Sequence, residues 1–159
     1  MRRDDGGSAA ITTVLLLPLL LSVLLGVVEL GALRILAARV ASAADLATLA
    51  ATDDQDAAAL ASSGVLRLAP DAVAVARRYF ALNLAQLGTQ LAVSPDLAAA
   101  GADVAAFARV PATDPVTGWH YERPTVRLAA SVPVRAPAFA ALFMPDIVVI
   151  NIRAASAPR

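Results

Sequence analysis

The sequence contains no cysteine, no lysine and a single histidine among its 159 residues. The absence of cysteine excludes a disulfide framework and a thiolate metal site. The lack of a second histidine excludes an imidazole pair for metal binding or for orienting a general base. The 13 basic residues balance 13 acidic ones, so the chain has no basic field for nucleic acid. We therefore expect no bound metal and no nucleic-acid partner.

Motifs that carry catalysis are also missing from the sequence. There is no G-x-S-x-G turn, no phosphate-cradling glycine loop and no pair of carboxylates at a catalytic spacing. A lone histidine such as His120 is far more often a surface or partly packed residue than a catalytic one. The carboxylates between Asp53 and Asp56 lack the fixed spacing of a calcium loop and favour a solvated helix start. We predict a protein that is not an enzyme and uses no cofactor.

What the sequence does contain is an unbroken apolar run from Ala9 to Val28. About 20 helical residues, at about 1.5 Å each, cover the ~30 Å hydrocarbon core of a bilayer. Pro18 removes one hydrogen bond of this helix, which a membrane helix tolerates as a kink. A helix buried in a soluble core is the less favoured alternative, because charged residues flank the run at both ends. Signal cleavage at Ala41–Ala43 is also less favoured, because that motif lies far beyond the run.

The apolar run divides the chain into successive segments. They are a cytoplasmic tail at residues 1–8, a transmembrane helix at 9–28, a helical stem at 29–61 and an extracytoplasmic domain at 62–159. Apolar positions continue to recur every three or four residues beyond the run, so one helix is expected from about Gly7 to Ala51. Thr52 and Gln55 have the spacing of a capping box for a further short helix. The short tail favours an N-terminus in the cytoplasm and a domain on the outer side of the cytoplasmic membrane.

The extracytoplasmic domain is predicted to be α+β, with an antiparallel sheet whose apolar face packs on two helices. Pro70 and Asp71 open the second helix, with Asp71 able to cap it, and Gly88 ends it. The apolar positions of that helix fall on one face, as core packing requires. Arg77 and Arg78 lie beside that face and are expected to be solvated.

Strands are expected in the C-terminal half of the domain, where the apolar pattern changes to a period of two. They are placed at residues 90–93, 104–110, 126–135 and 147–154, giving three or four strands. Pro133 favours an edge position for its strand, and Arg127 is expected on the wetted face. Residues 94–101 are expected to form a loop, residues 136–145 a helical turn, and the tail from Ser156 is expected to be loose.

Residues at the outer end of the apolar run are candidates for packing between subunits. Gly26 and Ala32 are small, so two membrane helices can approach closely there. Glu29 stands where the run ends, and its carboxylate is either wetted by lipid headgroups or paired with a neighbouring subunit. The first of these is favoured.

The order of these features resembles the TadE/TadG-like proteins of the tight-adherence (Flp) pilus assembly system. Residues 7–11 (GSAAI) look like the start of the family's N-terminal segment, and residues 25–31 (LGVVELG) are similar to the signature that closes its membrane helix. Residues 43–47 (AADLA) look like its stem, and the long strand, the link from Phe139 to Phe143 and the final strand fit its C-terminal pattern. The resemblance implies a pilin-like, non-enzymatic membrane protein that acts with other pilus-assembly or secretion components and can self-associate.

The resemblance also implies a candidate processing site for a prepilin peptidase at Gly7 and Ser8. Processed pseudopilins of the family usually carry a glutamate five residues after the cleavage glycine, and here that position is Thr12. Glu29 cannot replace that glutamate, because ~17 residues of helix place it roughly 25 Å away. The resemblance therefore favours the uncleaved, membrane-anchored relatives of the TadG type, or a pseudopilin that has lost the cleavage step.

The residues leave a second function open, a membrane-tethered extracytoplasmic binding module unrelated to pili. Such a module would present its sheet to a small ligand or to the cell wall. A concave pocket lined by a few convergent polar groups would favour it. A tethered hydrolase would need an acid–base pair, which the sequence does not provide.

Overall fold

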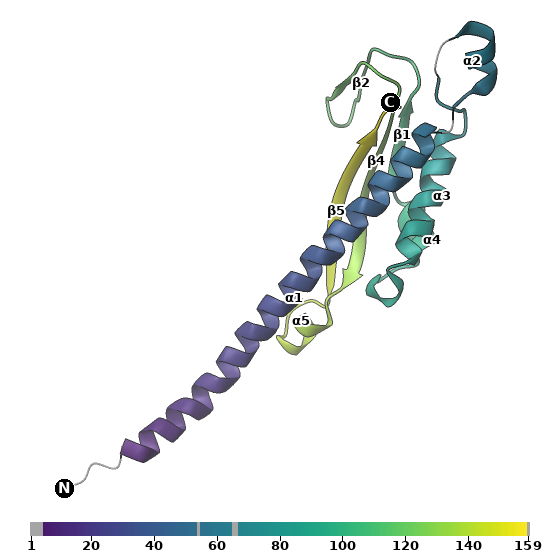
Figure 1. Ribbon diagram of the computed structural model, residues 1–159. Coiled ribbons are helices and arrows are strands. Elements are labelled where there is room, and N and C mark those ends of the chain that lie inside the picture. The colour runs from purple at the N-terminus through teal and green to yellow at the C-terminus, as the bar shows by residue number, and fades with distance from the viewer. Residues whose placement is uncertain (1–4, 54, 65–66, 159) are drawn as a thin grey trace.

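The computed structural model describes residues 5–53, 55–64 and 67–158, with the side chains of the first helix described from Thr12 onward. The molecule is elongated, and most of its elements gather beside the C-terminal half of one long helix (Figure 1). This helix, α1, spans Asp5–Asp53, close to the predicted Gly7–Ala51. Leucine and alanine dominate it, and both are strong helix formers. A single continuous helix, called the rod below, thus joins the N-terminal region to the folded head.

The head contains shorter helices. They are α2 (Ala57–Ser63), α3 (Ala72–Ala85), the 3₁₀ turn η1 (Gly88–Gln90), α4 (Pro95–Ala100) and α5 (Pro137–Ala141). Of these, α3 and α5 pack against α1, and α4 packs against α3. Helix α3 lies beside the C-terminal half of α1 and buries Ala76, Phe80 and Leu84, as its apolar face predicts. Helix α5 stands apart from the others, at the lower end of the head (Figure 1).

The head also contains a sheet of long antiparallel strands. Strands β1 (Asp103–Phe107), β4 (Thr125–Arg135) and β5 (Ile147–Ser156) pair in the order β1-β4-β5. Strands β2 (Ala112–Thr113) and β3 (His120–Tyr121) form a separate two-stranded pair within the β1–β4 connection. The predicted α+β class, with a small antiparallel sheet, is confirmed.

One face of the sheet and the C-terminal half of α1 enclose the core. The alternate residues Val126, Leu128, Val132 and Val134 of β4 are fully buried, as the period of two predicts. From α1 the core receives small side chains, among them Val40, Ala44, Ala47 and Ala51, all fully buried. Small residues let α1 approach both α3 and β5 closely, which fixes the head onto the rod.

Two predictions about β4 are wrong. The strand is central and not an edge strand. Pro133 is tolerated because β1 pairs only as far as Ala129, so no β1 residue needs the missing amide of Pro133. The carbonyl of Pro133 instead accepts a 3.0 Å hydrogen bond from the Ala92 amide. Arg127 is not wetted, since its side chain is 4% exposed and forms ion pairs with two aspartates.

The predicted N-caps of the two helices that follow α1 need correction. Thr52 does not cap a new helix, because α1 continues through it and its hydroxyl donates to the Leu49 carbonyl at 2.8 Å. The N-cap of α2 is Asp56, whose carboxylate accepts from the Ala59 amide at 3.0 Å. Asp71 precedes α3 without a capping hydrogen bond from its side chain.

Two segments predicted as a loop and a tail are also ordered differently. Residues 94–101 contain α4, which begins after a Ser94 cap that accepts from the Leu97 amide. The expected strand at 90–93 is reduced to one bridge between Leu91 and Val134. Ser156 belongs to β5 and not to a loose tail, because its hydroxyl lies 2.8 Å from that of Thr48 on α1.

Candidate functional site

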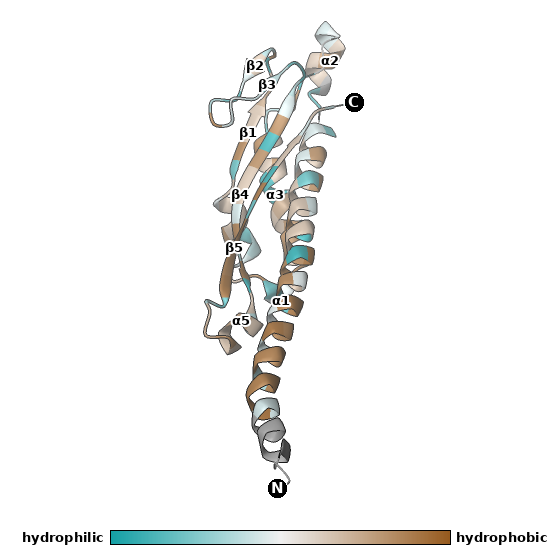
Figure 2. Ribbon diagram, turned by 90° about the vertical axis from the view of Figure 1, so that its left-hand side faces the viewer, coloured by the Kyte–Doolittle hydropathy of each residue, from teal (hydrophilic) through white to brown (hydrophobic). Residues whose placement is uncertain are grey.

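The N-terminal half of α1 exposes apolar side chains all around the helix. None of the residues in its most apolar 18-residue window is buried, and that window is long and apolar enough to cross a membrane. Figure 2 shows this apolar length of α1 extending beyond the head. A stripe facing a core would leave one side polar, whereas an apolar surface all around the helix matches a lipid surrounding. The helix therefore has the form of a membrane span.

The polar side chain of Ser22 is satisfied within this span. Its hydroxyl donates to the Pro18 carbonyl one turn earlier at 2.8 Å. A hydroxyl bonded to its own helix needs no partner from water, which a bilayer core cannot supply. The local geometry of the span thus suits an apolar solvent.

Glu29 lies where the span meets the head, on the side of α1 that faces its own chain. It is 9% exposed and lines a hollow of about 300 Å³ at the lower end of the head. Leu33 and Leu36 of α1, Gln90 of the η1 turn and Arg135 at the end of β4 contribute to the same hollow. A carboxylate and a guanidinium thus face one small space at the level where the chain leaves the apolar zone.

The other candidate packing residues take different positions on α1. A Cβ atom added to Gly26 would lie 3.7 Å from Cδ1 of Leu142, just beyond α5, so this glycine faces the chain's own head. Ala32 is exposed. Gly7 and Ser8 lie in the helical backbone of α1, and the side chain of Ser8 falls outside what the structure describes. The three packing candidates therefore do not share one free face.

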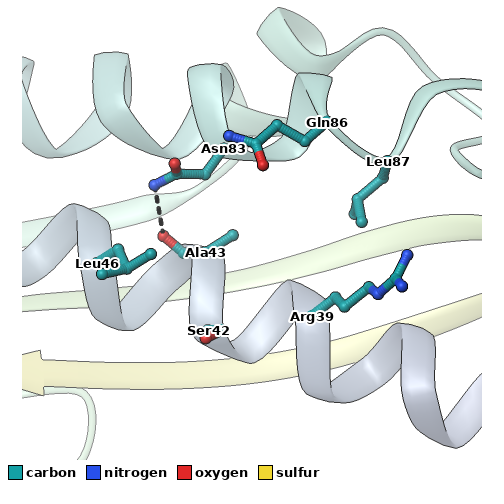
Figure 3. Close-up of a pocket in the computed structure, with 7 residues that line it drawn as sticks. All are labelled: Arg39, Ser42, Ala43, Leu46, Asn83, Gln86 and Leu87. Carbon is teal, nitrogen blue, oxygen red and sulfur yellow. Dashed lines mark hydrogen bonds between the residues drawn. The ribbon is translucent and has the colours of Figure 1, made fainter.

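A groove of about 290 Å³ runs between α1 and α3 (Figure 3). Arg39 and Ser42 line it from α1, and Asn83 and Gln86 from the end of α3. The Asn83 amide donates to the Ala43 carbonyl at 3.5 Å, which links the two helices across the groove. Polar groups from two elements converge here, which is the kind of lining a binding module would need.

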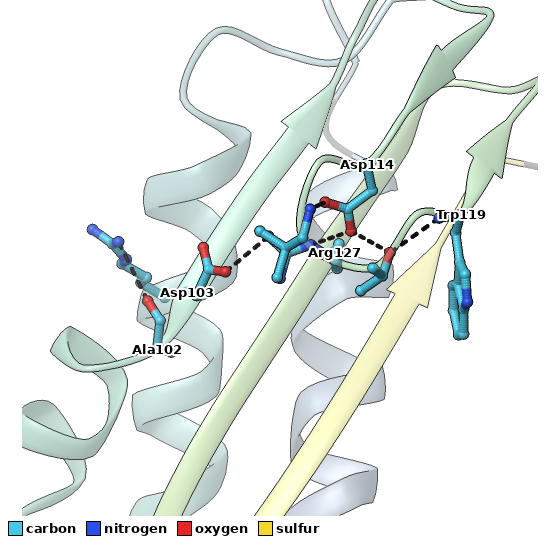
Figure 4. A network of polar contacts seen from close by, with 8 residues as sticks. Ala102, Asp103, Asp114, Trp119 and Arg127 are labelled. Carbon is cyan, nitrogen blue, oxygen red and sulfur yellow. Dashed lines mark hydrogen bonds and ion pairs between the residues drawn. The ribbon is translucent and has the colours of Figure 1, made fainter.

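An ionic network centred on the buried side chains of Arg127 and Asp114 ties the distal half of the sheet together (Figure 4). Arg127 on β4 contacts Asp103 of β1 at 2.9 Å through Nη2 and Asp114 of the β2–β3 connection at 2.9 Å through Nε. The side chain of Asp114 is fully buried, and it also accepts from the Thr117 hydroxyl at 2.6 Å and the Val116 amide at 3.0 Å. This network explains why Arg127 lies inside the head.

The pKa of Asp114 is lowered from its ordinary value despite this burial. Desolvation raises it, but the hydrogen bonds from Thr117 and Val116 and the charge of Arg127 together outweigh desolvation. The carboxylate is therefore a stably ionised structural anchor. A general acid at neutral pH would need the opposite shift.

The remaining chemical candidates take no part in these clusters. His120 is exposed on β3, where its Nδ1 lies 3.1 Å from the Thr113 hydroxyl. Arg77 and Arg78 are exposed on α3, and Arg77 donates to the Ala102 carbonyl at 3.4 Å. Among the residues that the structure describes, no group of three or more histidine, aspartate or glutamate side chains could hold a metal ion.

Comparison with family models finds a match, described as "Putative Flp pilus-assembly TadE/G-like", over residues 7–54. Over this stretch, about a third of the chain, the sequence is similar to the TadE/G-like family. The stretch contains Gly26, Glu29 and Ala32 and covers almost the whole of α1. The resemblance identified from the sequence is thereby confirmed, and with the apolar helix it supports a membrane protein related to pilus assembly. No curated protein and no solved structure matches the chain.

Sequence patterns missed two features of the site region. Arg127 pairs with Asp114, which lies 13 positions earlier in an irregular connection between strands. No sequence motif with a fixed spacing predicts such a pair. The contact between Leu142 and the Gly26 position depends on the height at which the head docks on α1. The lack of charge in residues 136–145 was the available signal for the second feature.

Proposed function

We propose that this chain is a non-enzymatic, single-pass component of Flp/Tad-type pilus assembly or secretion, of the TadE/TadG-like minor pilin or anchor type. The observation that carries the proposal is the division of α1, whose TadE/G-like segment joins a fully exposed apolar half to a half packed into a head. An exposed apolar helix of this length matches the thickness of a bilayer core, which supports a membrane span. The rod fixes the molecule in the bilayer and holds the head at a set height.

In this proposal the N-terminus lies in the cytoplasm and the head outside the cytoplasmic membrane. The head carries exposed charged residues on its sheet and helices, such as Arg78 and Arg153, which suit an aqueous compartment.

The mechanism is association with other pilus components or with further copies of the chain. Side-by-side packing would use the outer end of the span at Ala32, because the other two candidates, Gly26 and Glu29, face the chain's own head. Ala32 is exposed, so it is the position from which a neighbouring chain can be reached directly. Glu29 is 9% exposed and lines a hollow of its own chain with Arg135, so it would not be the first contact for a partner.

Photocrosslinking from Ala32 tests this proposal. A photoreactive amino acid replaces Ala32 in cells that produce the complete pilus apparatus, and a matched variant carries it at Arg109. Arg109 is exposed in the loop after β1, at the end of the sheet away from the membrane. We expect Ala32 to crosslink to another pilus component or to a second copy, and Arg109 to do so much less. Recovering only monomer from Ala32 would contradict the proposal.

One observation favours the alternative of a tethered binding module. The groove between α1 and α3 brings Arg39, Ser42 and Asn83 together from two helices. If the alternative holds, replacing Asn83 with leucine should abolish the binding of a small ligand in that groove. Pilus assembly should stay intact in the same variant. Under the pilus proposal, crosslinking from Ala32 is unchanged by this substitution.

A further inference from the structure

The link between the last two long strands is an uncharged ten-residue excursion. Residues 136–145 read APAFAALFMP, and charged side chains stand only at its two ends, Arg135 and Asp146. The Ala136 amide donates to the Asp146 carbonyl at 2.7 Å, which closes the neck of the excursion. Phe139 is 9% exposed and anchors α5 to the head. The excursion is therefore a defined knob on the head.

The knob lies at the outer end of the predicted span. Leu142 approaches α1 at Gly26, where an added Cβ would lie 3.7 Å from its Cδ1. Gly26 precedes the end of the span at Val28 by two residues, or about 3 Å along the helix axis. Figures 1 and 2 show α5 at the lowest point of the head, beside the apolar length of α1. The tip of the knob is thus level with the boundary between hydrocarbon and headgroups.

The tip turns apolar side chains outward. Phe143 is fully exposed and has a φ of 57°, and Met144 is 51% exposed. A phenylalanine whose backbone lies in the left-handed region is uncommon. Such a backbone conformation often occurs at functional positions. Through Leu142, the apolar tip of the knob adjoins the exposed apolar surface of α1.

The backbone of the tip is already satisfied within the knob. The amides of Leu142 and Met144 donate to the Phe139 carbonyl, each at 2.9 Å, and the Phe143 amide donates to the Ala140 carbonyl at 3.1 Å. Backbone can enter the apolar edge of a bilayer only when its donors have partners. The knob meets this requirement without a neighbouring chain.

We propose that the knob is a second membrane contact, in which Leu142, Phe143 and Met144 insert into the outer edge of the bilayer beside α1. This inference rests on the proposed membrane span. Lipid is the occupant because the tip is uncharged, lies at the boundary level and continues the lipid-facing surface of α1. In this arrangement two contacts with the membrane, α1 and the knob, fix the tilt of the head.

Depth-dependent fluorescence quenching tests the contact on the full chain. Trp119 is the single tryptophan and lies on the connection before β3, at the distal end of the sheet. The variant W119F/F143W, reconstituted in vesicles of phosphatidylcholine brominated at defined acyl positions, reports on the tip. We expect blue-shifted emission with the strongest quenching from shallow bromines. The unaltered chain, with Trp119 as its reporter, should show no quenching by any of these lipids.

A third variant separates this inference from the proposed span. W119F/L20W places the reporter in the middle of the apolar run, where Leu20 is 63% exposed. Quenching in L20W without quenching in F143W would overturn the knob contact and leave the span standing. No quenching in either variant would overturn both. A blue shift in F143W without lipid quenching would mean that a second protein chain covers the tip, which also overturns the lipid contact.

Single-cysteine labelling checks the same contact in cells. The chain has no cysteine, so M144C and the distal R109C each carry one thiol. We expect a membrane-impermeant maleimide to label M144C at least ten times more slowly than R109C in spheroplasts. Equal rates would contradict insertion of the tip.

Discussion

The two halves of α1 share one backbone but have opposite surroundings. Between Thr12 and Val28 the helix is rich in leucine and valine, and these large side chains are exposed. Between Leu36 and Thr52 the helix is rich in alanine, and its buried positions are mostly alanine or threonine. Small side chains let other elements of the chain pack closely, and even in the N-terminal half Leu142 approaches α1 at Gly26, which has no side chain. Side-chain size, more than apolarity, therefore separates the part that meets lipid from the part that meets protein.

The largest effect is expected from placing charge in the N-terminal half. Replacing Leu16 and Leu20 with arginine puts two guanidinium groups near the middle of the span, at a cost of about 5–7 kcal/mol for insertion. The protein should lose resistance to alkaline carbonate extraction. The matched variant replaces Leu46 and Leu49, which are 54% and 43% exposed in the C-terminal half. That variant should stay in the membrane, and its release would contradict the division of α1.

A smaller effect, on the stability of the head, is expected from overpacking the C-terminal half of α1. Ala47 is fully buried, so replacing it with leucine forces α1 away from the sheet and lowers the free energy of unfolding of the head by about 1–3 kcal/mol. Urea unfolding in detergent measures this loss. Leu20→Ala, in the exposed half, should leave the head's stability within about 0.5 kcal/mol. If both substitutions destabilise the head equally, the two halves are not distinct.

The parts of this comparison that sequence could predict are those with a strong period. The unbroken apolar run and the alternation in β4 each determine a surface from local residue types, so the long helix and the buried face of the sheet follow directly. The same holds for α5, where an uncharged Phe-bearing stretch predicts a helical turn. The family signature lies in this periodic part of the chain.

The parts that sequence could not predict depend on contacts between distant segments. Arg127 has the strand position of a wetted residue, yet Asp103 and Asp114 reach it from other elements and allow its burial. Thr52 matches a capping box, but α1 simply continues because the next available cap is Asp56. Local propensity and residue spacing do not indicate which distant side chains a residue will contact in the folded chain. Predictions from local sequence therefore misplace such residues.

Acid should act on the head and spare the N-terminal half, since no titratable group lies between Thr12 and Val28. The folded-state pKa of Asp114 lies below its unfolded value of 3.8, so its contribution to stability is complete above that value and is lost as the pH falls through the lowered pKa. The head should therefore lose stability below about pH 4. Asp114→Asn should flatten this part of the pH profile, measured by near-ultraviolet circular dichroism. An unchanged acid profile would contradict a structural role for the ion pair.

The smallest effect tests the hydroxyl link that joins the C-terminal half of α1 to the last strand. The Thr48 hydroxyl lies 2.8 Å from that of Ser156 and also donates to the Asp45 carbonyl at 3.0 Å. Thr48→Val and Ser156→Ala should each lower the head's stability by about 0.5–1.5 kcal/mol, and the double variant should cost less than their sum because they share one contact. Ser22→Ala provides the control in the other half, since its hydroxyl bonds only within its own helix. Strict additivity of the two substitutions would mean that the link does not couple α1 to the sheet.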